Sequence, residues 1–210
     1  RMVRAPLALL QDSPPVPRWQ WPLIAVFSLL AWLAFEQLSS QLWFLPAGLR
    51  LALLWLTPTR RWGWLGASEV AAQAVKSLVL GYPLFTTTFL AVCVAPWLIY
   101  AAVVLALRGP QPAPVFEGPT RMIKFLLAGL FGAAGVSPLL WMFLVTVPMT
   151  TADTLASMFA FMYGDLIGQL VLAPLLLAVM HGELAKRRGR LWRDLVLVLA
   201  GALAVFLLLH

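Results

Sequence analysis

LWFLPAGLRLALLWLTPTRRWGWLGASEVAAQAVKSLVL, residues 42–80, contains two apolar runs separated by the basic pair Arg60-Arg61. Each run carries charge in its interior: Arg50 lies in the first, and Glu69 and Lys76 lie in the second, which is visibly less apolar. Basic residues collect at the cytoplasmic ends of membrane spans. The stretch therefore predicts two antiparallel membrane-spanning helices joined by a short cytoplasmic turn.

The whole chain has the composition of a membrane protein. Of its 210 residues, 62% are hydrophobic and 11% are charged, whereas about 25% are charged in an average soluble domain. The mean hydropathy is +0.90. Fifteen Lys and Arg with eight Asp and Glu cannot cover the surface of a soluble domain of this length. The composition excludes a soluble enzyme, a disordered tail, a fibrous protein and a disulfide scaffold.

Further apolar runs lie on both sides of residues 42–80. A run of 15 residues at 195–209 would measure about 22 Å as a helix, less than the roughly 30 Å of a hydrocarbon core, so we interpret it as a truncated seventh span. The predicted fold class is all-α, a polytopic integral membrane helix bundle formed by residues 21–210. Its six complete spans are expected at about 21–39, 42–56, 62–80, 84–107, 122–147 and 154–180.

The distribution of basic residues predicts the orientation of these spans. With the N-terminus in the cytoplasm, 13 of the 15 Lys and Arg fall in inside segments, and none falls in the outside turns near 40–41, 81–83 and 148–153. The outside turns are too short to form a separate ligand-binding domain. The inside segments are the Pro- and Arg-rich leader 1–20 and the loops 57–61, 108–124 and 181–194.

Five ionisable residues fall inside the predicted spans: Glu36, Arg50, Glu69, Lys76 and Asp165. Counted from the cytoplasmic end of each helix, Arg50 and Glu69 lie at about 15 Å and 12 Å, which predicts that they pair. The other three lie at about 22–27 Å. There Lys76 is expected to pair with Asp165 or Glu36, and Lys76 is the one intramembrane cation at the depth of Asp165. These layers either line a signal-responsive cavity or serve only to hold helices together.

A polar stripe marks the predicted span at 62–80. Trp62, Gly66, Glu69, Gln73 and Lys76 recur at helical spacing, so this face should point into the bundle, as a cavity lining or for interhelical hydrogen bonds. The residues that we expect at a ligand or signal cavity are Arg50, Glu69, Gln73, Lys76, Asp165 and Gln169.

Small residues and prolines indicate how the spans pack. Steps of four residues separate Gly164 from Gly168, Ala128 from Gly132 and Gly129 from Ala133, and such steps favour close helix approach. Prolines that can kink the spans are Pro46, Pro96, Pro138 and Pro174.

Motifs for catalysis, cofactors or metals are not apparent in the sequence. Cys93 is the single cysteine, and the two histidines, His181 and His210, are far apart, so neither a disulfide nor a metal site is expected. A glycine-rich phosphate loop and a catalytic triad are also missing. The sequence therefore predicts no cofactor and leaves open whether the parent protein is an enzyme. Nucleic-acid binding is not expected, because no basic patch with interleaved aromatic residues projects from a soluble domain.

Residues 42–72 and 163–177 resemble the bacterial membrane-associated sensor domain of the first type, an integral-membrane input module. The resemblance includes the membrane half of hexose-phosphate-uptake-type sensor histidine kinases. This chain departs from the family pattern in having Leu45 between Phe44 and Pro46, and Tyr163 in a position where Trp is common. The residues that match the family motifs are Trp43, Phe44, Pro46, Gly48, Leu49, Trp64, Gly66, Gly164, Asp165, Gly168 and Pro174.

The resemblance implies a sensory input module in the bacterial inner membrane, with a cytoplasmic output domain beyond residue 210. The expected output is a histidine kinase of a two-component system, and the alternative is a diguanylate cyclase. A small transporter or channel subunit is a third alternative, because buried charges also mark substrate paths. The implied partners are the lipid bilayer, a second copy joined through the output domain, and a membrane partner protein.

Overall fold

The computed structural model describes residues 20–39, 44–84, 86–109, 118–144 and 150–180. Within these ranges the chain forms helices joined by short turns, and no strand occurs there. The expected leader, the basic loop 181–194 and the expected seventh span at 195–209 lie outside the described residues, apart from Gln20 at the end of the leader.

The helices follow the predicted apolar runs closely. The expected span at 62–80 is a helix over Trp62–Val79, and the expected span at 154–180 is a helix over Thr151–Met180. The elements are α2 (Gln20–Gln37), α3 (Leu45–Leu56), η1 (Thr59–Arg61), α4 (Trp62–Val79), α5 (Thr87–Phe89), the π-helical turn η2 (Leu90–Val94), α6 (Ala95–Arg108), α7 (Pro119–Leu144) and α8 (Thr151–Met180).

Three helical runs among the described residues are long and apolar enough to cross a membrane: Thr87–Arg108, Pro119–Met142 and Thr151–Leu177. The first of these combines α5, η2 and α6. Trp21–Gln37 and Leu45–Leu56 are shorter apolar helices, and α4 is less apolar, as the sequence predicts. These results agree with a membrane protein that is entirely helical over its described length.

Helix α3 is shorter than the span expected at 42–56. Its 12 residues measure about 18 Å along the axis. Pro46 lies in the first turn, where a missing N–H costs no helical hydrogen bond, and Phe44 before it has non-helical backbone angles. The amide of Phe44 instead donates to the carbonyl of Gly164 on α8, at 2.9 Å. The backbone that leads into α3 is therefore satisfied by another helix.

Glycines allow α3 and α8 to approach closely. A Cβ atom added to Gly168 would overlap the carbonyl of Phe44, and one added to Gly48 would lie 2.9 Å from the Cβ of Leu172. The close approach that the sequence predicts at Gly164 and Gly168 is confirmed, with α3 as the partner. Because Phe44 meets Gly164 and Gly48 meets Gly168, α3 and α8 run in the same direction.

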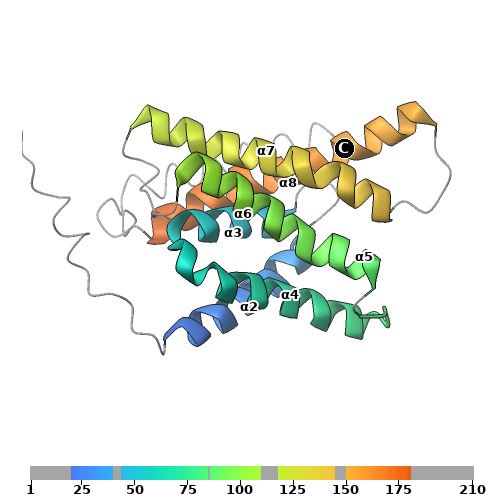
Figure 1. Ribbon diagram of the computed structural model, residues 1–210, viewed down its shortest axis with the longest axis horizontal. Helices are drawn as coiled ribbons and strands as arrows, with labels where there is room; N and C mark the ends of the chain where they lie inside the picture. Colours follow the sequence, from blue (N-terminus) through green and yellow to red (C-terminus); the bar gives the residue numbers. More distant parts are fainter. Residues whose placement is uncertain (1–19, 40–43, 85, 110–117, 145–149, 181–210) are drawn as a thin grey trace, which may run out of the picture.

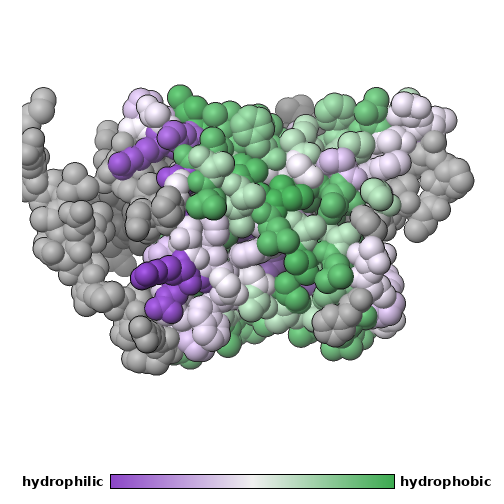
Figure 2. All heavy atoms as spheres, in the orientation of Figure 1, coloured by the Kyte–Doolittle hydropathy of each residue, from purple (hydrophilic) through white to green (hydrophobic). Residues whose placement is uncertain are grey.

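One end of the molecule gathers most of the described basic residues, and we call it the basic end. Figure 2 shows strongly hydrophilic side chains at the left of the view and a largely hydrophobic surface over the middle. Arg61 lies over the ring of Trp21 at 5.2 Å, so the start of α2 meets the start of α4. Arg108 at the end of α6 donates to the carbonyls of Leu54 and Thr57, at 2.9 and 3.0 Å. Alternate helix ends therefore lie together at the basic end.

The helices form two packing groups. Helices α2 and α4 pack against each other, with a hydrogen bond of 3.2 Å from Ser68 to Ser28. Helices α3, α6, α7 and α8 form the second group, which lies above the α2–α4 pair in Figure 1. Toward the basic end a core that includes Trp55, Tyr100 and Phe125 fills the second group. We call the boundary between the α2–α4 pair and the second group the seam.

Candidate functional site

A buried ion pair crosses the seam. Arg50 on α3 donates through Nε to both carboxylate oxygens of Glu69 on α4, at 2.9 and 3.1 Å, and through Nη2 to Oε1. The two side chains are only 4% and 6% exposed. Helical rise places both residues at the same depth, and the polar stripe turns Glu69 toward the bundle interior. The predicted Arg50–Glu69 pair is therefore confirmed.

A second ion pair lies within the α2–α4 pair. Lys76 donates to Glu36, and their side chains are 42% and 13% exposed. The structure thus selects Glu36 from the two partners expected for Lys76. Both residues lie in the last turn of their helix, at the end opposite the basic end.

Asp165 on α8 bonds to a residue that sequence reasoning did not single out. The hydroxyl of Tyr100 on α6 donates to Oδ2 of Asp165 at 3.0 Å and accepts a hydrogen bond from Nε2 of Gln169. The Arg50 guanidinium lies over the Tyr100 ring, 5.0 Å from its centroid. The expectation that Lys76 is the donor to Asp165 was wrong, because the two residues share a depth but belong to opposite sides of the seam.

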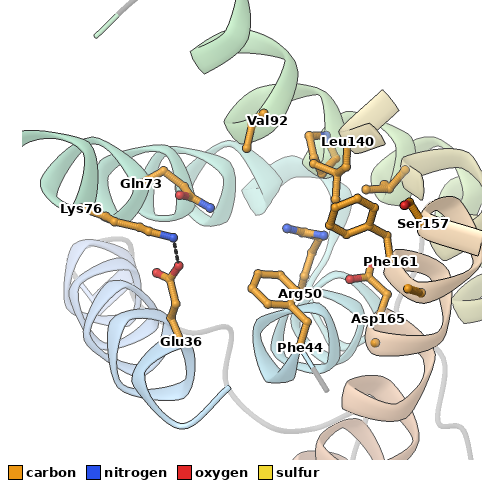
Figure 3. Close-up of a pocket in the computed structure, with 14 residues that line it drawn as sticks. Glu36, Phe44, Arg50, Gln73, Lys76, Val92, Leu140, Ser157, Phe161 and Asp165 are labelled. Carbon is orange, nitrogen blue, oxygen red and sulfur yellow. Dashed lines mark hydrogen bonds and ion pairs between the residues drawn. The ribbon is translucent and has the colours of Figure 1, made fainter. Parts of the chain in front are cut away.

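A cavity of about 470 Å³ opens between the two helix groups, in the half of the molecule away from the basic end. Figure 3 shows Gln73, Arg50 and Asp165 directed into the same space from α4, α3 and α8. Most of the wall is apolar and includes Phe44, Phe161 and residues of η2 and α7. The lining residues are Glu36, Phe44, Arg50, Gln73, Lys76, Val92, Pro96, Val136, Leu140, Ser157, Ala160, Phe161, Gly164 and Asp165.

Local backbone features shape this wall. The π-helical turn over Leu90–Val94 precedes Pro96, which lies in the first turn of α6 and cannot donate a backbone hydrogen bond. Turns of this kind are frequent at functional sites. Val92 and Pro96 from this segment both line the cavity.

Four of the six residues expected at a cavity line this one: Arg50, Gln73, Lys76 and Asp165. The other two, Glu69 and Gln169, lie behind the wall and bond to Arg50 and Tyr100. The inward orientation predicted for the polar stripe is confirmed, since Trp62, Gly66, Glu69 and Gln73 are all buried and Lys76 is partly buried.

Tyr100, Phe44 and Phe161 complete the site, and only Phe44 was singled out from the sequence, as a motif residue. A signal for Tyr100 was present. A tyrosine hydroxyl within an apolar run needs a hydrogen-bond partner when it is buried, and Tyr100 is fully buried. Phe161 had no such signal, because phenylalanine is ordinary in an apolar helix.

The cavity can bind a small organic molecule. Its volume lies in the range of roughly 300–1,000 Å³ that is usual for ligand pockets, and it combines an apolar wall with a few polar groups. In the described part of the chain, no three His, Cys, Asp or Glu side chains lie together in a way that could hold a metal ion. Comparisons of the chain with protein-family models, curated proteins and solved structures found no match.

Proposed function

We propose that this chain is the membrane-embedded sensory input module of a bacterial signal-transduction protein, with a sensor histidine kinase as its output. The observation that carries the proposal is the cavity at the seam. Residues from both family-like segments line it, since Phe44 and Gly164 meet at its wall, and the same two helices also meet through Gly48 and Gly168. Charged residues line the cavity from both helix groups, Arg50 and Asp165 from the second group and Glu36 and Lys76 from the α2–α4 pair, so a molecule that binds there would contact both sides of the seam.

The proposed topology has six spans, with the basic end and the N-terminus in the cytoplasm of a bacterial inner membrane. The alternating helix ends and the basic residues gathered at one end support it. The cavity then faces the periplasmic half of the membrane. In a Cys93→Ser background, Tyr82→Cys should react with an impermeant thiol reagent in intact cells, and Arg60→Cys should react only after permeabilisation. The opposite pattern would reverse the orientation.

Signalling is tested with a charge-neutral variant of the cavity. Asp165→Asn keeps the size of the side chain and removes its charge. Asp153→Asn is the matched control, because Asp153 is an exposed aspartate on the same helix. In the parent protein, Asp165→Asn should alter or lock the output while Asp153→Asn leaves it unchanged. Normal output from a stable Asp165→Asn protein would refute a sensory role for this carboxylate.

The output is identified by sequencing the gene beyond the codon for His210. A phospho-acceptor histidine helix would support the kinase, in which two copies associate through the output domain. A G-G-D-E-F-type domain would support the alternative, a diguanylate cyclase. A stop codon would count against both and would favour a module that acts through a membrane partner protein.

A small transporter or channel subunit is the second candidate function, favoured by the charged residues that line the cavity. A continuous pore is not supported, because the core with Trp55, Tyr100 and Phe125 closes the bundle toward the basic end. Reconstituted vesicles that carry the chain should therefore show no flux of solutes small enough to enter the cavity. Saturable flux that Asp165→Asn abolishes would replace the sensor proposal with a transporter.

A further inference from the structure

Three carboxylates and two cations lie at the cavity when Glu69, which is behind the wall, is counted with the lining residues. Arg50 and Lys76 each have a carboxylate partner, Glu69 and Glu36 respectively. Asp165 is a third carboxylate and is only 4% exposed. Arg50 lies near enough to attract Asp165 electrostatically, but two of its guanidinium nitrogens are already bonded to Glu69. Among the described residues Asp165 has no ion pair, and its one hydrogen bond comes from Tyr100.

This excess of negative charge is costly in a buried site. Transfer of an ionised carboxylate from water into an apolar environment is unfavourable unless a partner charge or several hydrogen bonds compensate it. One tyrosine hydroxyl supplies a single hydrogen bond to Oδ2, and within the described chain Oδ1 receives none. The cavity beside Asp165 leaves room for a further positive group to approach it.

Gln73 provides a second, independent indication of a ligand. The residue is 8% exposed and lines the same cavity, and within the described residues its amide has no hydrogen-bond partner. Figure 3 shows this amide directed into the space toward Arg50. The amide faces the open space of the cavity, so a bound molecule with a hydroxyl or carbonyl group can accept a hydrogen bond from it.

The remaining wall favours an organic cation over a hydrated metal ion. Phe44 and Phe161 lie on either side of Arg50 in Figure 3, and Val92 and Leu140 add aliphatic surface. Aromatic faces attract alkylated ammonium groups, whose hydration is weak. A small metal ion would need several oxygen ligands, which this wall does not supply.

We propose that the cavity binds a small organic cation, with its ammonium group beside Asp165 and a polar group on Gln73. This inference rests on the proposed function in one respect: it names the chemical class of the molecule that the sensory module detects. The binding step itself requires only the chain described here.

The test compares three probes of similar shape that differ in charge. These are choline, its uncharged carbon analogue 3,3-dimethylbutan-1-ol, and the anion 3,3-dimethylbutanoate. Binding to the full chain in lipid nanodiscs is measured by calorimetry for the unaltered protein, for Asp165→Asn and for the control Asp153→Asn. Choline should bind at least about tenfold more tightly than the alcohol, and Asp165→Asn should remove that preference while Asp153→Asn keeps it.

Several results would overturn the proposal. Equal affinity for choline and the alcohol would mean that Asp165 carries no charge for a ligand to balance. Preference for the anion would assign the site to the Arg50 guanidinium, and binding of none of the probes would reject a cation site. Loss of binding in both aspartate variants would overturn the assignment to Asp165, because Asp153 is exposed and does not line the cavity. A Gln73→Leu variant changes the same cavity but keeps Asp165. It should bind choline more weakly than the unaltered protein and should still prefer choline over the anion.

The proposed function and the ligand class fail in different ways. If choline binds through Asp165 but the output of the parent protein does not respond to it or to Asp165→Asn, the sensory role fails and the cation site stands. If Asp165→Asn alters the output and only the neutral or anionic probe binds, the sensory role stands and the ligand class fails.

Discussion

Removal of the negative charge from Glu69 should destabilise the protein far more than the same change at Glu36. Glu69→Gln leaves the Arg50 guanidinium buried and without its ion-pair partner. At 2.9 Å and an effective dielectric constant of 20, the Coulomb energy of such a pair is about 6 kcal/mol. Glutamine keeps an acceptor oxygen for Arg50, so the expected loss is about 3–5 kcal/mol, as is usual when one partner of a buried ion pair is removed.

Glu36→Gln is the matched control, because it makes the same chemical change in the other ion pair. Lys76 in that pair is 42% exposed, so it can reach solvent or lipid headgroups when the carboxylate is lost. The expected cost is at most about 1 kcal/mol. The difference in burial between the two pairs thus predicts a difference of at least about 2 kcal/mol between two chemically identical substitutions.

The assay is unfolding of the purified protein in mixed micelles by increasing amounts of a denaturing detergent, followed by the fluorescence of its ten Trp residues. A third variant, Arg50→Met with Glu69→Leu, removes both charges and should recover most of the stability that Glu69→Gln loses. Equal losses for Glu69→Gln and Glu36→Gln would refute the reasoning, as would a double variant that is less stable than Glu69→Gln.

Three further substitutions test the packing with the same assay. Gly168→Ala should cost about 1–3 kcal/mol, because the new methyl group meets backbone atoms that cannot move aside. Gly63→Ala is the control, since it has open space and should be neutral or slightly stabilising. Similar effects of the two substitutions would contradict the close contact between α3 and α8. Arg108→Met should cost about 1–3 kcal/mol because it removes the donor from carbonyls at the end of α3, and an unchanged stability would mean that water replaces the guanidinium. Tyr100→Phe should cost about 1–3 kcal/mol by removing the hydrogen bonds to Asp165 and from Gln169, and the loss should be smaller in a background of Asp165→Asn if the two residues are coupled as the structure shows.

The sequence predicted the helices well, because their apolar runs and basic boundaries are local features. It also predicted the Arg50–Glu69 pair, because the two residues lie on consecutive helices and helical rise alone fixes their depth. The polar stripe of α4 was predictable for a similar reason, since helical periodicity determines which residues share a face.

The partner of Asp165 could not be found by the same reasoning. Depth along a helix says nothing about which helices are neighbours, and Lys76 and Asp165 lie in different packing groups. The true donor, Tyr100, belongs to α6, which packs against α3 and α7, the two helices that pack against α8. The start of α3 at Leu45 could not be predicted either. An apolar residue such as Phe44 fits a helix by composition, but in the structure its backbone is non-helical and bonds to α8.

The contact between Phe44 and α8 has a consequence for the biogenesis of the proposed membrane module. Helix α3 is synthesised early, yet the carbonyl that accepts the Phe44 amide belongs to Gly164 on the last helix of the described chain. At about 5–20 residues per second, several seconds of translation separate the two segments. During that interval the amide has to use water or another temporary partner, since an unsatisfied backbone group is costly in lipid. Helix α3 can therefore reach its final position only after α8 has left the ribosome. A nascent chain that stalls before Gly164 would present an incompletely inserted α3 to the insertion and proteolysis machinery of the cell.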